Sequence, residues 1–162
     1  MADSPASASE NLLFDAARRG DLTALQQLLA EGVDVNARND RGFSALVLAA
    51  YDNHSDAVSL LLEAGADPNL QDASGNTALM GVAFKGYTDI AGLLIGRGAE
   101  LNARNGTAST ALMYAVMFGR NDMATMLLEA GADATLRDGR GLSARDLAGQ
   151  HNNSQALELL PE

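Results

Sequence analysis

A period of 33 residues runs through most of this 162-residue chain and constrains its fold more than any other feature. Glycines, hydroxyl residues and asparagines each recur with this step. The glycines are Gly32, Gly65, Gly98 and Gly131, the hydroxyl residues are Ser44, Thr77, Thr110 and Ser143, and the asparagines are Asn36, Asn69 and Asn102, with Thr135 in the fourth place. A unit of this length cannot bury its apolar face alone and does so by stacking on its neighbours. The period therefore predicts a stack of small units.

Each unit carries the signals of two short helices joined by a turn, as residues 39–71 illustrate. Ser44 is a typical N-cap residue and is expected to begin a first helix of about two turns. A turn is expected near Asn53, and a second helix follows with apolar residues at helical spacing from Val58 onward. Gly65 is expected to end this helix, because glycine adopts the left-handed conformation without a steric cost. A loop then leads to the next unit.

The order of these motifs resembles the ankyrin repeat. The unit reads G-x-T-x-L, then Ala, then Gly, then LLEAGAD-x-N-A, and the G-x-T-A-L-M variant is similar to small stand-alone bacterial members of the family. The resemblance covers residues 11–162 and implies an all-α repeat solenoid, an ankyrin stack of helix-turn-helix units with hairpin loops and about five repeats including degenerate caps. The expected repeats are 11–38, 39–71, 72–104, 105–137 and 138–162, and residues 1–10 are expected to form a disordered N-terminal tail.

The chain departs from the family pattern in two places. The family's T-P-L-H appears without its proline and histidine, as Ser44-Ala45-Leu46-Val47 and its equivalents. In the last unit, Arg145 replaces the leucine that would face a further repeat. A charged outer face suits an end cap that meets water, so the chain is expected to be a monomer.

Charge and composition exclude several classes of function. The formal net charge is −10, which disfavours binding to nucleic acid or to an anionic membrane surface. The chain has no cysteine, so disulfides and thiolate sites are impossible. No apolar run is long enough to span a bilayer, and the first ten residues lack the features of a secretory signal. A cytoplasmic location is therefore expected.

No combination of residues predicts catalysis. The two histidines, His54 and His151, lie in a turn and in the last unit, where structural roles are the usual ones. The glycines mark repeat boundaries and do not form a phosphate-binding loop. Acidic residues recur in rows, such as Asp56, Asp89 and Asp122, which is typical of a solvated face. We therefore expect no enzyme activity, no cofactor and no metal site.

The residues that break the repeat are the better candidates for binding, because the fold does not dictate them. In the ankyrin family such positions are the hairpin tips and the last turn of the first helix. The candidates here are Arg41, Phe43, Tyr51, Asp52, Phe84, Lys85, Met117, Phe118 and Arg140. Only 4% of the chain is aromatic, yet four of the seven aromatic residues fall in this set. Two interpretations stay open: the rings anchor a partner, or they pack against each other across neighbouring repeats.

A row of arginines lies just before the hairpin tips, at Arg38, Arg104 and Arg137. These side chains either bind carboxylates of a partner or serve the scaffold. The resemblance implies a non-catalytic module that binds another protein in its concave groove and at its hairpin tips, in an inhibitory, immunity or assembly role. The alternative is an accessory factor for catalase or haem supply in oxidative-stress defence, as for some small bacterial ankyrin proteins.

Overall fold

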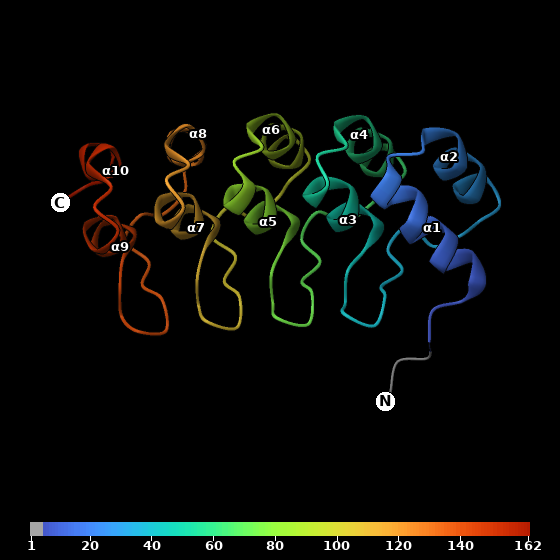
Figure 1. The fold of residues 1–162 in the computed structure, drawn as a ribbon, viewed down its shortest axis with the longest axis horizontal. Coiled ribbons are helices and arrows are strands. Elements are labelled where there is room, and N and C mark those ends of the chain that lie inside the picture. The colour runs from blue at the N-terminus through green and yellow to red at the C-terminus, as the bar shows by residue number, and fades with distance from the viewer. Residues whose placement is uncertain (1–4) are drawn as a thin grey trace.

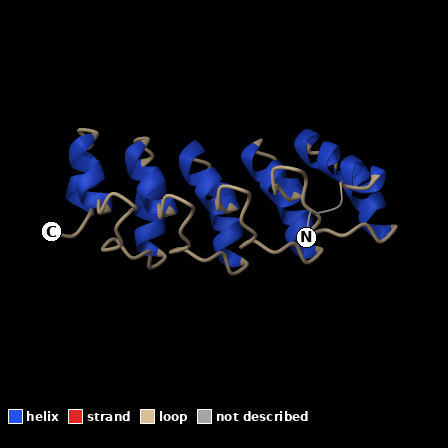
Figure 2. Ribbon diagram, turned by 90° about the horizontal axis from the view of Figure 1, so that it is seen from below, coloured by secondary structure: helices blue, strands red, loops and turns tan. Residues whose placement is uncertain are grey.

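The computed structural model describes residues 5–162 as five pairs of antiparallel helices arranged in a row (Figure 1). The helices are α1 (Ala8–Arg19), α2 (Leu22–Ala30), α3 (Ala45–Tyr51), α4 (Ser55–Glu63), α5 (Ala78–Lys85), α6 (Thr88–Gly96), α7 (Ala111–Met117), α8 (Asn121–Glu129), α9 (Ala144–Gln150) and α10 (Ser154–Leu159). The odd-numbered helices form an inner layer beside the hairpin loops, and the even-numbered helices form an outer layer. Figure 2 shows the units side by side along the row. Within residues 5–162 there is no strand, so the expected all-α repeat stack is confirmed.

The hydroxyl residues of the repeat cap the inner helices as expected. The side chain of Thr77 accepts a hydrogen bond from the backbone N–H of Met80, and Ser44, Thr110 and Ser143 cap α3, α7 and α9 in the same way. In the turn between α3 and α4, the backbone of Asn53 adopts the left-handed conformation (φ 64°). This conformation lets the chain reverse direction between the two short helices. Local signals in the sequence therefore set where the inner helices begin.

The core is one continuous apolar layer between the two rows of helices. Leu46, Leu79 and Leu112 occupy equivalent positions in α3, α5 and α7, and each is 1% exposed. Small buried alanines, such as Ala49, allow each inner helix to pack closely on the next, so that α1, α3, α5, α7 and α9 form a chain of contacts. At the fourth equivalent position, Arg145 donates hydrogen bonds to the last carbonyl groups of α10. The expected polar end of the stack is thus built around a guanidinium group.

Hydrogen bonds between units repeat with the same period as the sequence. The Oδ1 atom of Asn36 accepts the backbone N–H of Asp67 at 2.8 Å, and Asn69 and Asn102 make the equivalent bonds to the units that follow them. Neighbouring hairpins are also joined through their backbones, for example from the N–H of Ala73 to the carbonyl of Arg41. These bonds fix the hairpins relative to one another, because they join polar groups of adjacent units.

The N-terminal boundary needs a correction. Residues 1–4 of the expected tail lie outside the described residues, but residues 8–10 form the first turn of α1. Ser7 caps this helix in a capping box: its side chain accepts the N–H of Glu10, and Glu10 accepts the N–H of Ser7. The motif S-x-x-E is the sequence signal for this helix start, and the small, polar composition of the first ten residues hides it.

Candidate protein-binding groove

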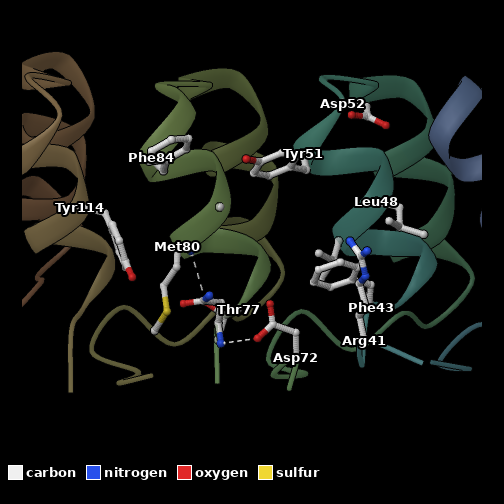
Figure 3. Close-up of a pocket in the computed structure, with 13 residues that line it drawn as sticks. Arg41, Phe43, Leu48, Tyr51, Asp52, Asp72, Thr77, Met80, Phe84 and Tyr114 are labelled. Carbon is white, nitrogen blue, oxygen red and sulfur yellow. Dashed lines mark hydrogen bonds between the residues drawn. The ribbon is translucent and has the colours of Figure 1, made fainter. Parts of the chain in front are cut away.

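A cavity of about 480 Å³ lies on the inner layer between α3 and α5, beside the hairpins (Figure 3). Its walls come from three consecutive units. The lining residues are Arg41, Phe43, Val47, Leu48, Tyr51, Asp52, Asp72, Asn76, Thr77, Met80, Gly81, Phe84 and Tyr114. We call the cavity and the adjoining surface of α5 and α7 the inner-face groove. Its lining is mostly apolar with a few polar groups at the rim, as is usual for recognition sites.

Gly81 adds space to the cavity because it has no side chain. Leu48, Gly81, Tyr114 and Leu147 occupy one repeat position, so α3, α7 and α9 each place a large apolar or aromatic side chain where α5 has none. Gly81 lies in the interior of α5, and its φ is not in the left-handed region. A Cβ atom built on it would lie 3.4 Å from Cδ2 of Tyr51, which is an ordinary contact. The backbone therefore does not require glycine at this position. The cavity next to Gly81 distinguishes this unit from its neighbours.

Aromatic rings continue the groove from the cavity to α7. The rings of Phe84 and Phe118 meet edge to face with their centroids 4.5 Å apart, and Tyr114 stacks on Phe118 at 6.4 Å. Tyr51 and Phe118 nevertheless remain 42% and 47% exposed. The rings thus pack on each other across neighbouring units and still present apolar surface to solvent. The interpretation that the rings pack across neighbouring repeats is confirmed, and the interpretation that they anchor a partner stays a prediction.

The charged candidates differ in what they contact. Lys85 lies over the ring of Tyr51, with Nζ 4.5 Å from the centroid, in a cation–π contact. Arg140 pairs with Asp138 at 3.1 Å, within its own hairpin. Arg41 occupies the equivalent place in an earlier hairpin and lines the cavity. Arg41 and Lys85, together with the lining residue Asp52, give the rim of the groove charges of both signs.

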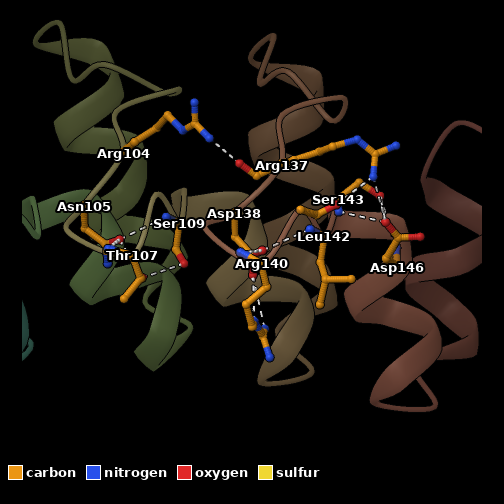
Figure 4. A network of polar contacts seen from close by, with 11 residues as sticks. Arg104, Asn105, Thr107, Ser109, Arg137, Asp138, Arg140, Leu142, Ser143 and Asp146 are labelled. Atoms are coloured by element: carbon orange, nitrogen blue, oxygen red, sulfur yellow. Dashed lines mark hydrogen bonds and ion pairs between the residues drawn. The ribbon is translucent and has the colours of Figure 1, made fainter.

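The arginine row serves the scaffold in this structure (Figure 4). Arg38 donates to the carbonyl of Gln71 in the next unit, and Arg104 donates to the carbonyl of Arg137. Arg137 in turn donates to the carbonyl of Gly141 at 2.8 Å and pairs with a carboxylate of the last unit. These contacts favour the structural interpretation of the row.

A sequence comparison decides the family. Residues 13–105 and 64–138 match the model of the ankyrin repeats (three copies), which together is more than half of the chain. The chain belongs to the ankyrin-repeat family. A Pseudomonas aeruginosa protein named as an ankyrin repeat protein is 50% identical over 48 residues, which is 30% of this chain and 28% of that protein. Ankyrin repeat domain-containing protein 29 of Homo sapiens is 49% identical over 49 residues, which is 30% of this chain and 16% of that protein. The matched segment therefore spans less than a third of either relative.

Ankyrin repeats are generally protein–protein interaction modules, and the family is typically non-catalytic. Within residues 5–162, no helix is long and apolar enough to cross a membrane. The same residues contain no group of three or more His, Asp or Glu side chains placed to hold a metal ion.

The ankyrin stack brings most of the predicted binding residues together. Arg41, Phe43, Tyr51, Asp52 and Phe84 line the cavity, while Lys85 and Phe118 contact members of that group. Met117 lies half-buried at the end of α7, and Arg140 lies at a distant hairpin and is not among the lining residues. Sequence reasoning missed Met80, Gly81 and Tyr114. The available signal was Gly81, which breaks a row of large side chains.

A second row that sequence reasoning missed shapes the hairpin tips. Asn39, Asp72, Asn105 and Asp138 share one repeat position, and the Oδ1 atom of each accepts the N–H groups two and four residues further on. At Asp138 these bonds have an electrostatic consequence. The N–H of Leu142 is the main cause that lowers the pKa of Asp138, and Arg140 lowers it further, against the opposing effect of burial.

Two further aspartates are held in their charged form by neighbouring hydroxyl residues. The hydroxyl group of Thr135 lowers the pKa of Asp133, and the backbone N–H of Ser143 lowers the pKa of Asp146. Both contacts are local and stabilise loops or a helix start. Neither carboxylate belongs to the groove.

Proposed function

We propose that this chain is a non-catalytic module that binds a segment of a partner protein in the inner-face groove and against the hairpin tips. The observation that carries the proposal is the exposure of Tyr51, which lines an apolar cavity, and of Phe118, which packs on the lining residue Phe84. Aromatic side chains at the centre of a concave surface supply most of the binding energy in many interfaces. A contiguous apolar patch of this kind generally marks an interaction site. Such binding would serve an inhibitory, immunity or assembly role.

The rigidity of the hairpins supports the proposal. Backbone hydrogen bonds join consecutive hairpins at 2.8–3.0 Å, and each tip is closed by an Asn or Asp side chain. A surface that is already ordered loses little conformational entropy when a partner binds. The groove is therefore preorganised, and its affinity depends mainly on the side chains that line it.

The proposed contact residues fall into two groups. Apolar anchors lie along the groove, and charged residues lie at its rim and at the hairpin tips. The anchors are Phe43, Tyr51, Phe84, Met117 and Phe118, and the charged residues are Arg41, Asp52, Lys85 and Arg140.

A pull-down that compares matched variants tests the proposal. Replacing the three ring residues Tyr51→Ala, Phe84→Ala and Phe118→Ala should abolish capture of the partner from a native extract while circular dichroism shows an intact helical stack. The control replaces one exposed acid in each of α4, α6 and α8, at Asp56, Asp89 and Asp122, and should leave capture unchanged. If the folded ring variant retains the partner, the groove is not the binding site.

We do not extend the proposal to haem supply. Two side chains that could ligate haem iron, His54 and Tyr114, already have structural partners. The Nε2 atom of His54 lies 2.7 Å from the carbonyl oxygen of Arg18 and ties α4 to the end of α1. The hydroxyl oxygen of Tyr114 accepts a hydrogen bond from the side chain of Asn105 at 2.8 Å. Either residue would have to give up this contact to ligate iron. A haem titration without a Soret shift is the expected result.

A further inference from the structure

Arg41 carries a guanidinium group that the fold does not use. Within residues 5–162, every arginine except Arg41 and Arg97 has a side-chain hydrogen bond or an ion pair. A comparison with the last hairpin explains why Arg41 has no partner. Arg140 pairs with Asp138 at 3.1 Å, whereas the residue that corresponds to Asp138 in the hairpin of Arg41 is the neutral Asn39. Arg41 therefore lacks the local carboxylate that its repeat position can supply.

The free guanidinium lies at the mouth of the cavity above Gly81. Figure 3 shows Arg41 beside Phe43 on the α3 side, with Tyr51, Phe84 and the rest of the apolar lining further along. An exposed guanidinium at the edge of an apolar cavity binds a carboxylate with two parallel hydrogen bonds, and the low local dielectric of the cavity strengthens them. Adjacent residues of an extended segment have Cα atoms about 3.8 Å apart, so one segment can fill the cavity and reach the rim.

We propose that Arg41 and the Gly81 cavity form one recognition subsite for a partner segment in which a large apolar side chain is next to a carboxylate. The apolar side chain occupies the space above Gly81, and the carboxylate binds the guanidinium of Arg41. This inference rests on the proposed function and specifies the chemistry of the partner.

The surrounding charges restrict the partner to an isolated carboxylate. Asp52 and Asp72 also line the cavity, and a second hollow next to it, which Arg41 lines as well, contains Asp40, Asp52 and the ion pair of Asp15 with Arg18. The whole chain has a formal net charge of −10. An extended acidic segment would be repelled by these groups, while a single carboxylate opposite Arg41 is attracted.

Phage-displayed random dodecapeptides, selected on the intact protein, test the subsite. Gly81→Leu fills the cavity with the residue type that α3 and α9 carry at this position, and Arg41→Gln removes the charge but keeps a polar side chain of similar length. Arg97→Gln and Gly92→Ala are the matched controls, since Arg97 also has no side-chain partner but lies at the end of α6 outside the cavity lining, and Gly92 is exposed on α6 with no atom within 4 Å of an added Cβ.

The expected result is a set of peptides with an aromatic or large aliphatic residue next to Asp or Glu. Gly81→Leu should abolish their binding, and Arg41→Gln should weaken it by about tenfold or more, as should replacement of the peptide Asp by Asn. Both controls should bind like the wild type. A simple loss of structure is excluded if each variant retains the wild-type circular dichroism spectrum.

Two other outcomes overturn the inference in different ways. Peptides that lose binding with Gly81→Leu but are basic or unaffected by Arg41→Gln would leave the groove as the binding site and refute the carboxylate subsite. Selected peptides that are unaffected by Gly81→Leu, or the absence of any groove-dependent peptide, would refute the subsite. The triple ring variant then decides the proposed function separately, through its effect on capture of the natural partner.

Discussion

Gly81→Ala should make the protein more stable and its groove less able to bind. Gly81 lies inside α5 with helical backbone angles, where glycine costs about 1 kcal/mol relative to alanine. The new Cβ would meet only Cδ2 of Tyr51 at 3.4 Å, an attractive contact that adds a few tenths of a kcal/mol at most. The free energy of unfolding should therefore rise by about 1 kcal/mol. For a chain of this size, that gain corresponds to an increase in Tm of about 2–4 °C.

Urea unfolding followed by far-UV circular dichroism measures the effect. The midpoint of the unfolding transition should move to a higher urea concentration. The dependence of the unfolding free energy on urea should stay the same, because the surface exposed on unfolding hardly changes. Gly92→Ala is the matched control: it has the same propensity gain in α6 and should raise stability equally. Only the change at Gly81 should weaken binding of groove-dependent peptides, and Gly81→Leu should abolish it. Loss of function with a gain in stability is the expected signature of a binding-site residue.

A lower urea midpoint for Gly81→Ala would refute the reasoning about the backbone. It would mean that the contact with Tyr51 is repulsive and that the fold itself requires glycine at this position. Equal binding by Gly81→Leu and the wild type would refute the reasoning about the cavity, even if the predicted stability gain were observed.

Three further predictions concern the scaffold. Ala108→Gly should raise the free energy of unfolding by roughly 0.5–1 kcal/mol in urea titrations, because Ala108 has φ 57° and a left-handed alanine costs more than the extra chain entropy of glycine. Asp138→Asn should flatten the loss of stability in acid, which urea midpoints measured between neutral pH and pH about 3 would show. The lowered pKa of Asp138 gives stability that is complete above the unfolded pKa of about 3.9 and is lost as the pH falls through the lower folded value. Arg145→Ala should speed amide hydrogen exchange in α10 and lower stability by about 1–2 kcal/mol, because it removes the hydrogen bonds to the end of that helix.

Two of the scaffold predictions have an internal control. Gly75→Ala should destabilise, since its φ is 81° and its added Cβ would lie 2.9 Å from the backbone nitrogen of Gly106. Asp138→Asn should keep the hairpin fold at neutral pH, because Asn39 and Asn105 close their hairpins through an amide oxygen in the same way. A steeper acid transition in Asp138→Asn, or unchanged exchange in α10 of Arg145→Ala, would contradict the account of that contact.

Most of the fold could be predicted from the sequence, because the same local signals recur in every unit. Ser44 and its equivalents cap the inner helices, and Gly65 and its equivalents end the outer helices in the left-handed conformation. The start of α1 was also encoded, through the capping box of Ser7 and Glu10, but composition pointed to a disordered tail. A motif of four residues decides this boundary more reliably than the average polarity of ten.

The site was less predictable, because it depends on contacts between units. Two features of the site follow only when α3, α5 and α7 are placed side by side. Phe84 and Phe118 touch each other, and the missing side chain of Gly81 adds space to the cavity beside Tyr51. The different states of Arg41 and Arg140 likewise depend on a neighbouring residue that differs between two hairpins. Sequence reasoning marked irregular positions, and the packing of the units shows which of them form one surface.

Site-specific photo-cross-linking tests the central claim most directly, because it maps where the partner lies on the intact protein in its native cells. A benzophenone amino acid placed at Phe118 on the inner layer, which is 47% exposed, should give one cross-linked product of defined mass. The same probe at the exposed Glu63 of α4, on the outer layer, should give none. A product from Glu63 and none from Phe118 would show that the partner binds the opposite face and would contradict the account.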